Sequence, residues 1–462
     1  MPCQLPGASP HRPLRTLFVA LAVAGIVAAC GTSVPATGST AVASPGGSSS
    51  LPTAPIGSPI GSTASSTAGP TASSTASSTA PAPSPTPDAA AIYAVIESQV
   101  EQLRDLRATT PVQPILLDEA GLQRNIAASF AKDNPAAIVA ANQRLLELMG
   151  LLPPGSSLAD LYLKLLGSQV AGYYDPDTRQ LYVVSKSGAV GPTEQVTFAH
   201  EFTHALQDQQ FGLKRLDLGA VGQSDRSTAH LALAEGDATL VMTLWAQAHL
   251  GAAQLVQLFA DSNDPAQARI LADMPDVLKQ SLLFPYTSGL QFVLAQQAAG
   301  GWAAVDRLFA HPPASTEQIL HPEKYVSGEA PVAVSLPADL AARLGAGWSV
   351  DLRDTLGEFT LRVWLESAGR LTADVATGAA AGWGGDRVAV VRRGAQIGAV
   401  VDTRWDTVRD AGEFAAGART TLGRLTARHL IVAPAGSNRV TIVLGTDDAT
   451  VRSLAAALRL TP

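Results

Sequence analysis

Cysteine is nearly absent from this chain of 462 residues, and its two copies, Cys3 and Cys30, both lie close to the N-terminus. A disulfide framework and a cysteine-based zinc site are therefore excluded for the rest of the chain. Charged residues make up only 15% of the chain and aromatic residues 5%, so we expect a core of small and aliphatic side chains. The formal net charge is −7. No nucleic-acid partner is expected, because a nucleic-acid-binding surface needs a basic excess.

Long apolar runs are missing after the N-terminus, which excludes a protein with several membrane spans. At the N-terminus itself, His11, Arg12 and Arg15 precede an apolar stretch of 13 residues over positions 17–29. A short apolar stretch behind positive charges is typical of a secretory signal peptide, and it is short for a membrane span. We therefore expect residues 1–29 to be a signal peptide.

The end of this stretch, Val-Ala-Ala-Cys, resembles the lipobox of bacterial lipoproteins. The resemblance implies that Cys30 becomes the lipidated first residue of the mature chain and anchors it to the outer face of the bacterial cytoplasmic membrane, at the cell surface or on the periplasmic side. An ordinary signal peptide with an incidental cysteine is the alternative. Residues 30–87 are almost only Ser, Thr, Ala, Pro and Gly, which offer too little apolar surface to fold. They are expected to form a disordered tether.

From residue 88 onward the apolar pattern is that of a folded protein. Apolar residues recur every three or four positions over 90–108 and predict a helix. The other elements predicted up to residue 210 are a strand at 112–117, helices at 119–132, 135–149 and 158–168, strands at 170–174 and 180–184, and a helix at 193–210. The turn Asp-Pro-Asp-Thr between the last two strands predicts a hairpin directly before the last helix.

A His-Glu-Phe-Thr-His sequence lies on that last helix. His200 and His204 are one turn apart on the same face, where two imidazoles can share one Zn²⁺ ion. Glu201 stands one position further round, as expected of a general base beside the metal. Gln207 and Gln210 occupy the places where one class of such sites has Gly and a third His, so that class is excluded. Two solvated histidines on a surface helix are the alternative.

The third ligand is expected on a long apolar helix at 227–249. Glu235 lies in its middle, and an ionised glutamate among apolar residues is costly unless it is paired or bound to a metal. Gly236 beside it would let another backbone or a substrate come close. His230 and Asp237 are rival ligands, but Asp237 lies about 200° round the helix from Glu235, so the two should not both face the metal. A salt bridge is the alternative role for Glu235, and support of a ligand or a purely structural role remains open for Asp237.

His200-Glu201-x-x-His204 together with Glu235 resembles the gluzincin type of zinc metallopeptidase. More narrowly, three segments resemble a largely uncharacterised family of secreted bacterial metallopeptidases: 199–209, 232–238 and 313–322. The resemblance covers about Ile92 to Tyr325. It implies a zinc ion held by the two histidines and Glu235, and hydrolysis of a peptide or protein substrate with Glu201 as the general base.

One departure from thermolysin-like enzymes concerns the support of a histidine ligand. Those enzymes have an aspartate four residues after the ligand glutamate, where this chain has Thr239. Tyr286 and His321 are candidates for the hydrogen-bond donor that stabilises the oxyanion, although each is as readily a structural residue. The strand at 180–184 is the candidate sheet edge for an extended substrate.

The remainder is predicted as follows: helical structure over 270–308 with a break at Gly300-Gly301, strands at 387–392, 398–402, 430–433 and 439–444, and helices at 352–368, 407–422 and 449–458. The predicted fold class is α+β, with a largely helical zincin-like domain at 88–330, a small sheet before the His-Glu helix, and a C-terminal α+β module at 331–462. A surface-binding or scaffold lipoprotein without activity is the alternative function. The sequence leaves open the oligomeric state and whether residues 88–152 are an inhibitory pro-region.

Overall fold

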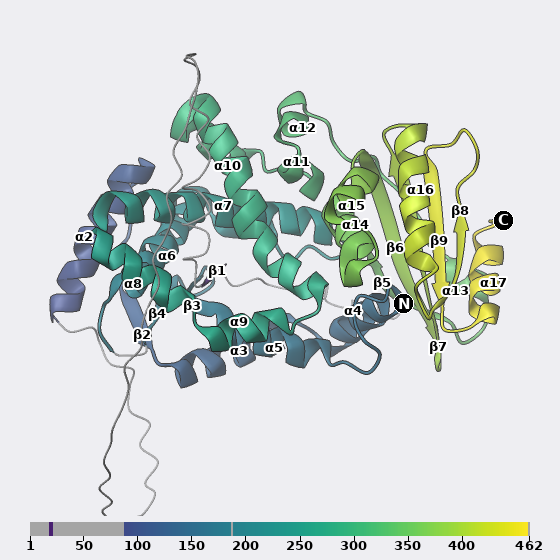
Figure 1. Ribbon diagram of the computed structural model, residues 1–462, viewed down its shortest axis with the longest axis horizontal. Coiled ribbons are helices and arrows are strands. Elements are labelled where there is room, and N and C mark those ends of the chain that lie inside the picture. The colour runs from purple at the N-terminus through teal and green to yellow at the C-terminus, as the bar shows by residue number, and fades with distance from the viewer. Residues whose placement is uncertain (1–17, 22–86, 186–187, 461–462) are drawn as a thin grey trace, which may run out of the picture.

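The computed structural model describes residues 18–21, 87–185 and 188–460 of the chain (Figure 1). The lipid-anchor candidate Cys30, the tether up to residue 86 and all of the expected signal peptide except 18–21 lie outside these ranges. The chain is α+β, as predicted. A helical part takes up one end of the molecule, and a module built on a five-stranded sheet takes up the other (Figure 1). No helix within the described ranges is both long enough and apolar enough to span a membrane.

The elements of the helical part are β1 (Phe18–Leu21), α2 (Pro87–Arg104), β2 (Pro114–Leu117), α3 (Glu119–Asp133), α4 (Ala136–Leu148), α5 (Leu158–Gln169), β3 (Val170–Asp175), β4 (Gln180–Val184), α6 (Pro192–Phe211), η1 (Leu213–Leu216), α7 (Ser224–His249), α8 (Ala252–Ser262), α9 (Pro265–Ala272), α10 (Asp276–Ala310), α11 (Thr316–Leu320) and α12 (Pro322–Ser327). The helix α10 is interrupted at Gly300 and Gly301, as the sequence indicated.

A small sheet in the order β1-β3-β4-β2 lies against α6. The strands β3 and β4 form the predicted antiparallel hairpin, and β2 runs parallel to β4. The expectation that residues 180–184 form the sheet edge was wrong, because β2 covers the outer side of β4. On the other side of the hairpin, β1 is paired with β3 in antiparallel register, with Ala20 opposite Gly172.

The elements of the C-terminal module are α13 (Leu340–Leu344), β5 (Ser349–Asp354), α14 (Gly357–Glu366), η2 (Ser367–Gly369), α15 (Ala373–Ala380), β6 (Trp383–Arg393), β7 (Gln396–Trp405), α16 (Val408–Leu422), β8 (Arg428–Val432), β9 (Arg439–Gly445) and α17 (Asp448–Ala457). Its antiparallel sheet has the order β5-β6-β7-β9-β8. The predicted start of a helix at residue 352 was wrong, because β5 runs to Asp354. The helix α15 was not predicted.

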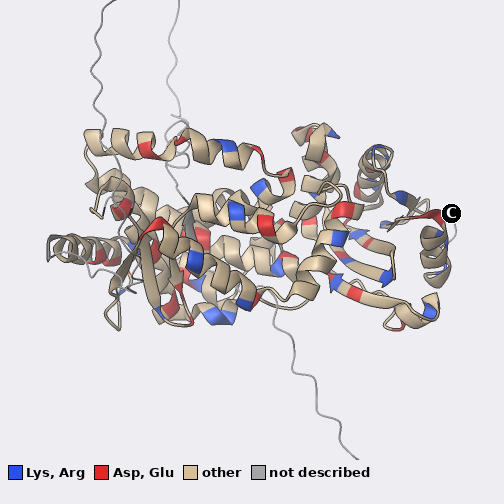
Figure 2. Cartoon of the chain, turned by 90° about the horizontal axis from the view of Figure 1, so that it is seen from below, with Lys and Arg blue, Asp and Glu red and all other residues tan. Residues whose placement is uncertain are grey.

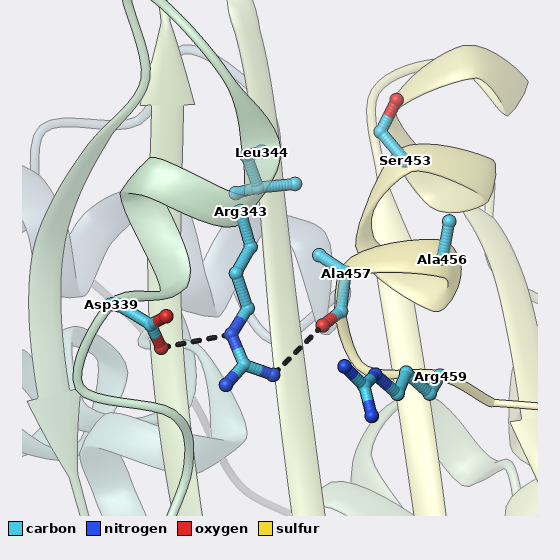
Figure 3. Close-up of a pocket in the computed structure, with 7 residues that line it drawn as sticks. All are labelled: Asp339, Arg343, Leu344, Ser453, Ala456, Ala457 and Arg459. Atoms are coloured by element: carbon cyan, nitrogen blue, oxygen red, sulfur yellow. Dashed lines mark hydrogen bonds and ion pairs between the residues drawn. The ribbon is translucent and has the colours of Figure 1, made fainter.

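Alternate residues of β6 face two different apolar clusters. Val388 and Val390 belong to the main core, which also contains Phe414 of α16, whereas Ala389 belongs to a smaller cluster with Leu454 of α17. Helices therefore cover both faces of this sheet. Between α13 and α17 lies an open hollow, in which Arg343 binds Asp339 and the carbonyl oxygen of Ala457 (Figure 3). Acidic and basic residues are interspersed along the elements (Figure 2).

The segment 313–322, part of the family resemblance, contacts both the helix α7 and the C-terminal module. The backbone N–H and the hydroxyl of Thr316 both donate to Oδ1 of Asp225, at the start of α7. Lys324 binds Glu317 and also Asp406, just after β7. These contacts join residues that are far apart in the sequence, so a structural role accounts for this motif.

The buried carboxyl group of Asp225 in this contact should make the stability of the fold depend on pH. Burial raises its pKa from 3.8 to about 7. A carboxyl whose folded-state pKa is raised stabilises the fold at low pH, and this stability is lost as the pH rises towards 7, at a cost of up to about 4 kcal/mol. Asp225→Asn keeps the oxygen that accepts both Thr316 hydrogen bonds. The variant should therefore melt at a higher temperature than the wild type at pH 8 and at a similar temperature at pH 4. If the difference in melting temperature between Asp225→Asn and the wild type were the same at pH 8 and at pH 4, the prediction would be wrong.

Candidate metal centre

Two histidines of α6 and one glutamate of α7 converge in the interior of the helical part. The Nε2 atoms of His200 and His204 lie 3.1 Å apart. Oε2 of Glu235 lies 3.1 Å from Nε2 of His200 and 3.3 Å from Nε2 of His204. All three side chains are buried. The structure thus brings together the three residues that the sequence proposed as metal ligands.

This triangle of donor atoms has the dimensions of a tetrahedral zinc site. Ligand atoms that bind zinc at 2.0–2.1 Å with tetrahedral angles lie about 3.3 Å from each other. The donor set of two imidazole nitrogens and one carboxylate oxygen is also one that catalytic zinc sites use. By both its distances and its chemistry, the site fits a zinc ion.

The ionisation of the ligands agrees with this fit. Burial lowers the pKa of His200, which favours the neutral imidazole that binds metals. Burial alone would raise the pKa of Glu235, but the two neighbouring imidazoles outweigh it and hold that pKa at about 2. The centre therefore holds a carboxylate at neutral pH.

The backbones of α7 and α10 touch beside the centre. A Cβ on Gly236 would lie 2.3 Å from the carbonyl carbon of Gly289, and a Cβ on Gly289 would lie 2.1 Å from the carbonyl oxygen of Ala232. Only glycine fits at these two positions. The close neighbour that the sequence suggested for Gly236 is thus another backbone, and the contact brings Tyr286, one turn before Gly289, close to Glu235.

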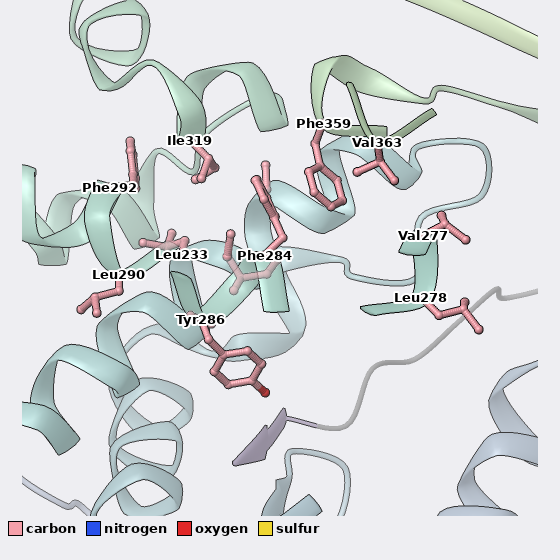
Figure 4. Close-up of a cluster of buried hydrophobic side chains, with 14 of the residues drawn as sticks. Leu233, Val277, Leu278, Phe284, Tyr286, Leu290, Phe292, Ile319, Phe359 and Val363 are labelled. Carbon is pink, nitrogen blue, oxygen red and sulfur yellow. The ribbon is translucent and has the colours of Figure 1, made fainter. Parts of the chain in front are cut away.

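Tyr286 is the candidate donor that lies at the centre. Its ring stacks on His200, with 6.2 Å between the ring centroids. Burial, and after it the charges of Glu235 and Glu201 and a hydrogen bond to Glu235, raise the pKa of Tyr286 well above its ordinary value, so the side chain remains a phenol that can donate a hydrogen bond. Figure 4 shows the ring at the border of an apolar cluster, with its hydroxyl pointing out of the cluster.

Glu201 lies where α6 meets the small sheet. A Cβ added to Gly172 on β3 would lie 3.4 Å from Cγ of Glu201 and 2.6 Å from Cγ2 of Thr197, so glycine lets β3 lie directly on this part of α6. The Glu201 carboxylate is fully buried and acts electrostatically on Tyr173 of β3 and on Tyr286. This residue therefore lies against β3 and within electrostatic range of the candidate donor.

His321 and His230, both considered from the sequence, are engaged elsewhere. His321 binds Glu358 of the C-terminal module at 2.9 Å, which makes it part of the contact between the two parts of the chain. His230 binds the carbonyl oxygen of Leu216 through Nδ1. Neither belongs to the group of possible metal ligands around His200 that the described residues form.

Asp237 is not among the three converging candidate ligands, as its angular position on α7 predicted. Its carboxylate accepts hydrogen bonds from Gln207 at 3.0 Å and from Arg104 at 2.8 Å. Gln207 entered the sequence argument only as a departure from another class of site, and Arg104 was missed entirely. A glutamine three positions after His204, and so on the same face of the helix, could have drawn attention to Gln207, but no pattern in the sequence points to Arg104.

A second group of carboxylates close enough to share an ion contains Glu317, Glu329 and Asp406. The ammonium group of Lys324 lies 2.6 Å from all three. The group is therefore a set of ion pairs around a lysine, and it is not a second metal centre.

Residues 342–458 match a family described as Domain of unknown function (DUF8575). The match lies within the C-terminal module and includes none of the residues at the metal centre. Neither the curated proteins nor the solved structures contain a match to the chain.

Proposed function

We propose that the protein is a zinc metallopeptidase, anchored by lipid at Cys30 to the outer face of a bacterial cytoplasmic membrane. The observation that carries this proposal is the buried triangle of His200, His204 and Glu235, with Glu201 next to it in the sequence and Tyr286 stacked on it. When bound there, Zn²⁺ would supply Lewis-acid chemistry that activates water at neutral pH.

The residues around the ligands can perform the proton transfers of peptide hydrolysis. The carboxylate of Glu201 would take a proton from the attacking water and pass it to the leaving amine. The phenol of Tyr286, kept protonated by its surroundings, would donate a hydrogen bond to the developing oxyanion. The three ligands and Glu201 come from consecutive helices, α6 and α7, which fixes their relative positions.

The side of β3 on which β1 is paired supports an extended peptide as the substrate. An extended segment of the chain itself, β1, is paired there in antiparallel register. Ala20 of that segment lies opposite Gly172, the residue packed against Glu201. Residues 18–21 belong to the expected signal peptide, so removal of that peptide would open this side of β3 to another extended chain.

The proposal is tested with the full chain, purified from membranes in mild detergent. Metal analysis should find about one zinc ion per chain, and an unfolded protein substrate such as denatured casein should be cleaved. A chelator should stop the cleavage, and added zinc should restore it. A folded chain that takes up no zinc would instead leave a surface-binding lipoprotein.

Tyr286→Phe is expected to lower kcat for peptide cleavage while zinc content stays at that of the wild type. Loss of one oxyanion donor costs about 10²–10³ in kcat. The ring and its stacking on His200 are retained, so KM should change little. The matched control is Tyr325→Phe, whose hydroxyl binds the carbonyl oxygen of His311 outside the centre. Equal activity of Tyr286→Phe and the wild type would show that the donor is another group.

A further inference from the structure

We propose that Gln207, Asp237 and Arg104 form a positioning chain that sets the tautomer and orientation of the ligand His204. This inference rests on the proposed zinc site. It assigns a role to three residues that the proposed reaction does not use, and it makes the helix α2 a component of the metal centre.

The positioning chain starts at the imidazole of His204. Its Nδ1 lies 2.9 Å from Oε1 of Gln207. The amide nitrogen of Gln207 lies 3.0 Å from the carbonyl oxygen of Ala234 and 3.0 Å from Oδ2 of Asp237. Oδ1 of Asp237 accepts from Nε of Arg104 at 2.8 Å. The side chains of His204, Gln207, Asp237 and Arg104 are all fully buried.

These contacts decide which atom of Gln207 faces His204. Two groups that can only accept hydrogen bonds, the Ala234 carbonyl and the Asp237 carboxylate, surround one end of the amide, so the NH₂ group must lie there. The amide oxygen is then turned to His204, which must carry its proton on Nδ1. In this tautomer Nε2 presents a lone pair towards His200 and Glu235. Asp237 therefore acts on the ligand through the orientation of Gln207.

Arg104 fixes the Asp237 carboxylate in place through the contact at 2.8 Å. Its other partners are Asp306, at 2.8 Å, and the ring of Trp302, 4.6 Å from the guanidinium carbon. A fully buried ion pair contributes little net stability by comparison with apolar packing. The Arg104–Asp237 pair lies directly behind the ligand His204. This position gives the pair a role in the site in addition to any effect on stability.

Arg104 is the last residue of α2, the first helix of the folded part. The positioning chain therefore also connects α2 to the site. Along this helix Gln99 accepts from the indole of Trp245 at 2.9 Å, and Tyr93 packs on Phe198, with 4.4 Å between the ring centroids. The partners Trp245 and Phe198 belong to α7 and α6, the two helices that carry the ligands. Removal of a releasable pro-region would leave the metal centre intact. Removal of α2 would instead take Arg104 away from Asp237.

The test measures zinc affinity by competition with a chromogenic chelator and follows the Nδ1–H proton of ¹⁵N-labelled histidine by NMR. In Gln207→Leu and Asp237→Asn, zinc affinity is expected to fall about 10–100-fold. The Nδ1–H signal of His204 in the apoprotein should be lost or shifted. Arg104→Met should weaken zinc binding similarly. If this variant does not fold, the zinc affinity of Arg104→Lys is measured in its place.

Matched controls separate positioning from general damage. Gln209→Leu removes an amide on the same helix that binds the backbone of Thr109 and Thr110. Arg370→Met removes another buried arginine, bound to backbone carbonyls far from the ligands in sequence. Both should keep the zinc affinity of the wild type. Unchanged affinity and an unchanged Nδ1–H signal in Gln207→Leu and Asp237→Asn would overturn the positioning chain but leave the zinc site standing. Absence of zinc from the wild type would overturn both.

Discussion

Glu201→Gln is expected to lower peptide cleavage by about 10²–10⁴-fold while the chain keeps its full complement of zinc. Glutamine has the same shape but cannot take the proton from attacking water or return it to the leaving amine. Glu201 is fully buried beside β3 and is not one of the three converging candidate ligands, so its loss should leave metal binding intact. The measurement pairs kcat on an unfolded protein substrate with metal analysis of the same preparation.

The matched control is Glu194→Gln, on the first turn of the same helix. Glu194 accepts a hydrogen bond from the backbone N–H of Gly191, and a glutamine oxygen can accept it equally well. This variant should retain wild-type cleavage. Wild-type kcat in Glu201→Gln, with one zinc per chain, would remove Glu201 from the mechanism. Loss of zinc from Glu201→Gln would show instead that the residue supports the metal.

Local spacing in the sequence predicted much of the centre. The four-residue separation of His200 and His204 requires that they share a face of a helix, and the structure places their Nε2 atoms 3.1 Å apart. The cost of an ionised carboxylate in an apolar helix singled out Glu235. The angle around α7 separated Asp237 from it. Each of these arguments needs only one helix and its geometry, which is why they could be made without knowing the fold.

Features that depend on pairing between distant segments could not be predicted in this way. Periodicity shows that 180–184 is a strand, but it does not show which neighbours a strand has, and β4 proved to be interior. Arg104 reaches Asp237 across 133 positions of sequence, with no local pattern to mark it. The strand β5 was not predicted, and the helix after it was started too early because Gly357 was not taken as a break. In the structure Gly357 has a φ of 76°, in the left-handed region that favours glycine.

Glu235→Ala is expected to abolish zinc binding under conditions in which the wild type holds about one ion per chain. The substitution leaves two imidazoles and no anionic ligand, and we expect it to weaken affinity by more than the roughly 100-fold that loss of a supporting contact costs. His204→Ala should have the same effect, because each change removes one corner of the triangle. Metal analysis after dialysis against a weak chelator measures both variants beside the wild type.

Stability provides an independent readout of the same loss. A ligand that binds only the folded state stabilises it in proportion to the logarithm of its concentration over its Kd, so zinc should raise the melting temperature of the wild type and leave that of Glu235→Ala unchanged. The matched control is Glu317→Gln, a buried glutamate that pairs with Lys324 outside the centre, and it should respond to zinc as the wild type does. If Glu235→Ala still bound zinc with wild-type affinity, the carboxylate would not be a ligand, and the short distances from Glu235 to the two imidazoles would reflect hydrogen bonding alone. If both ligand variants lose zinc while the control keeps it, the three side chains act as one site, and the peptidase proposal then depends only on Glu201 and Tyr286.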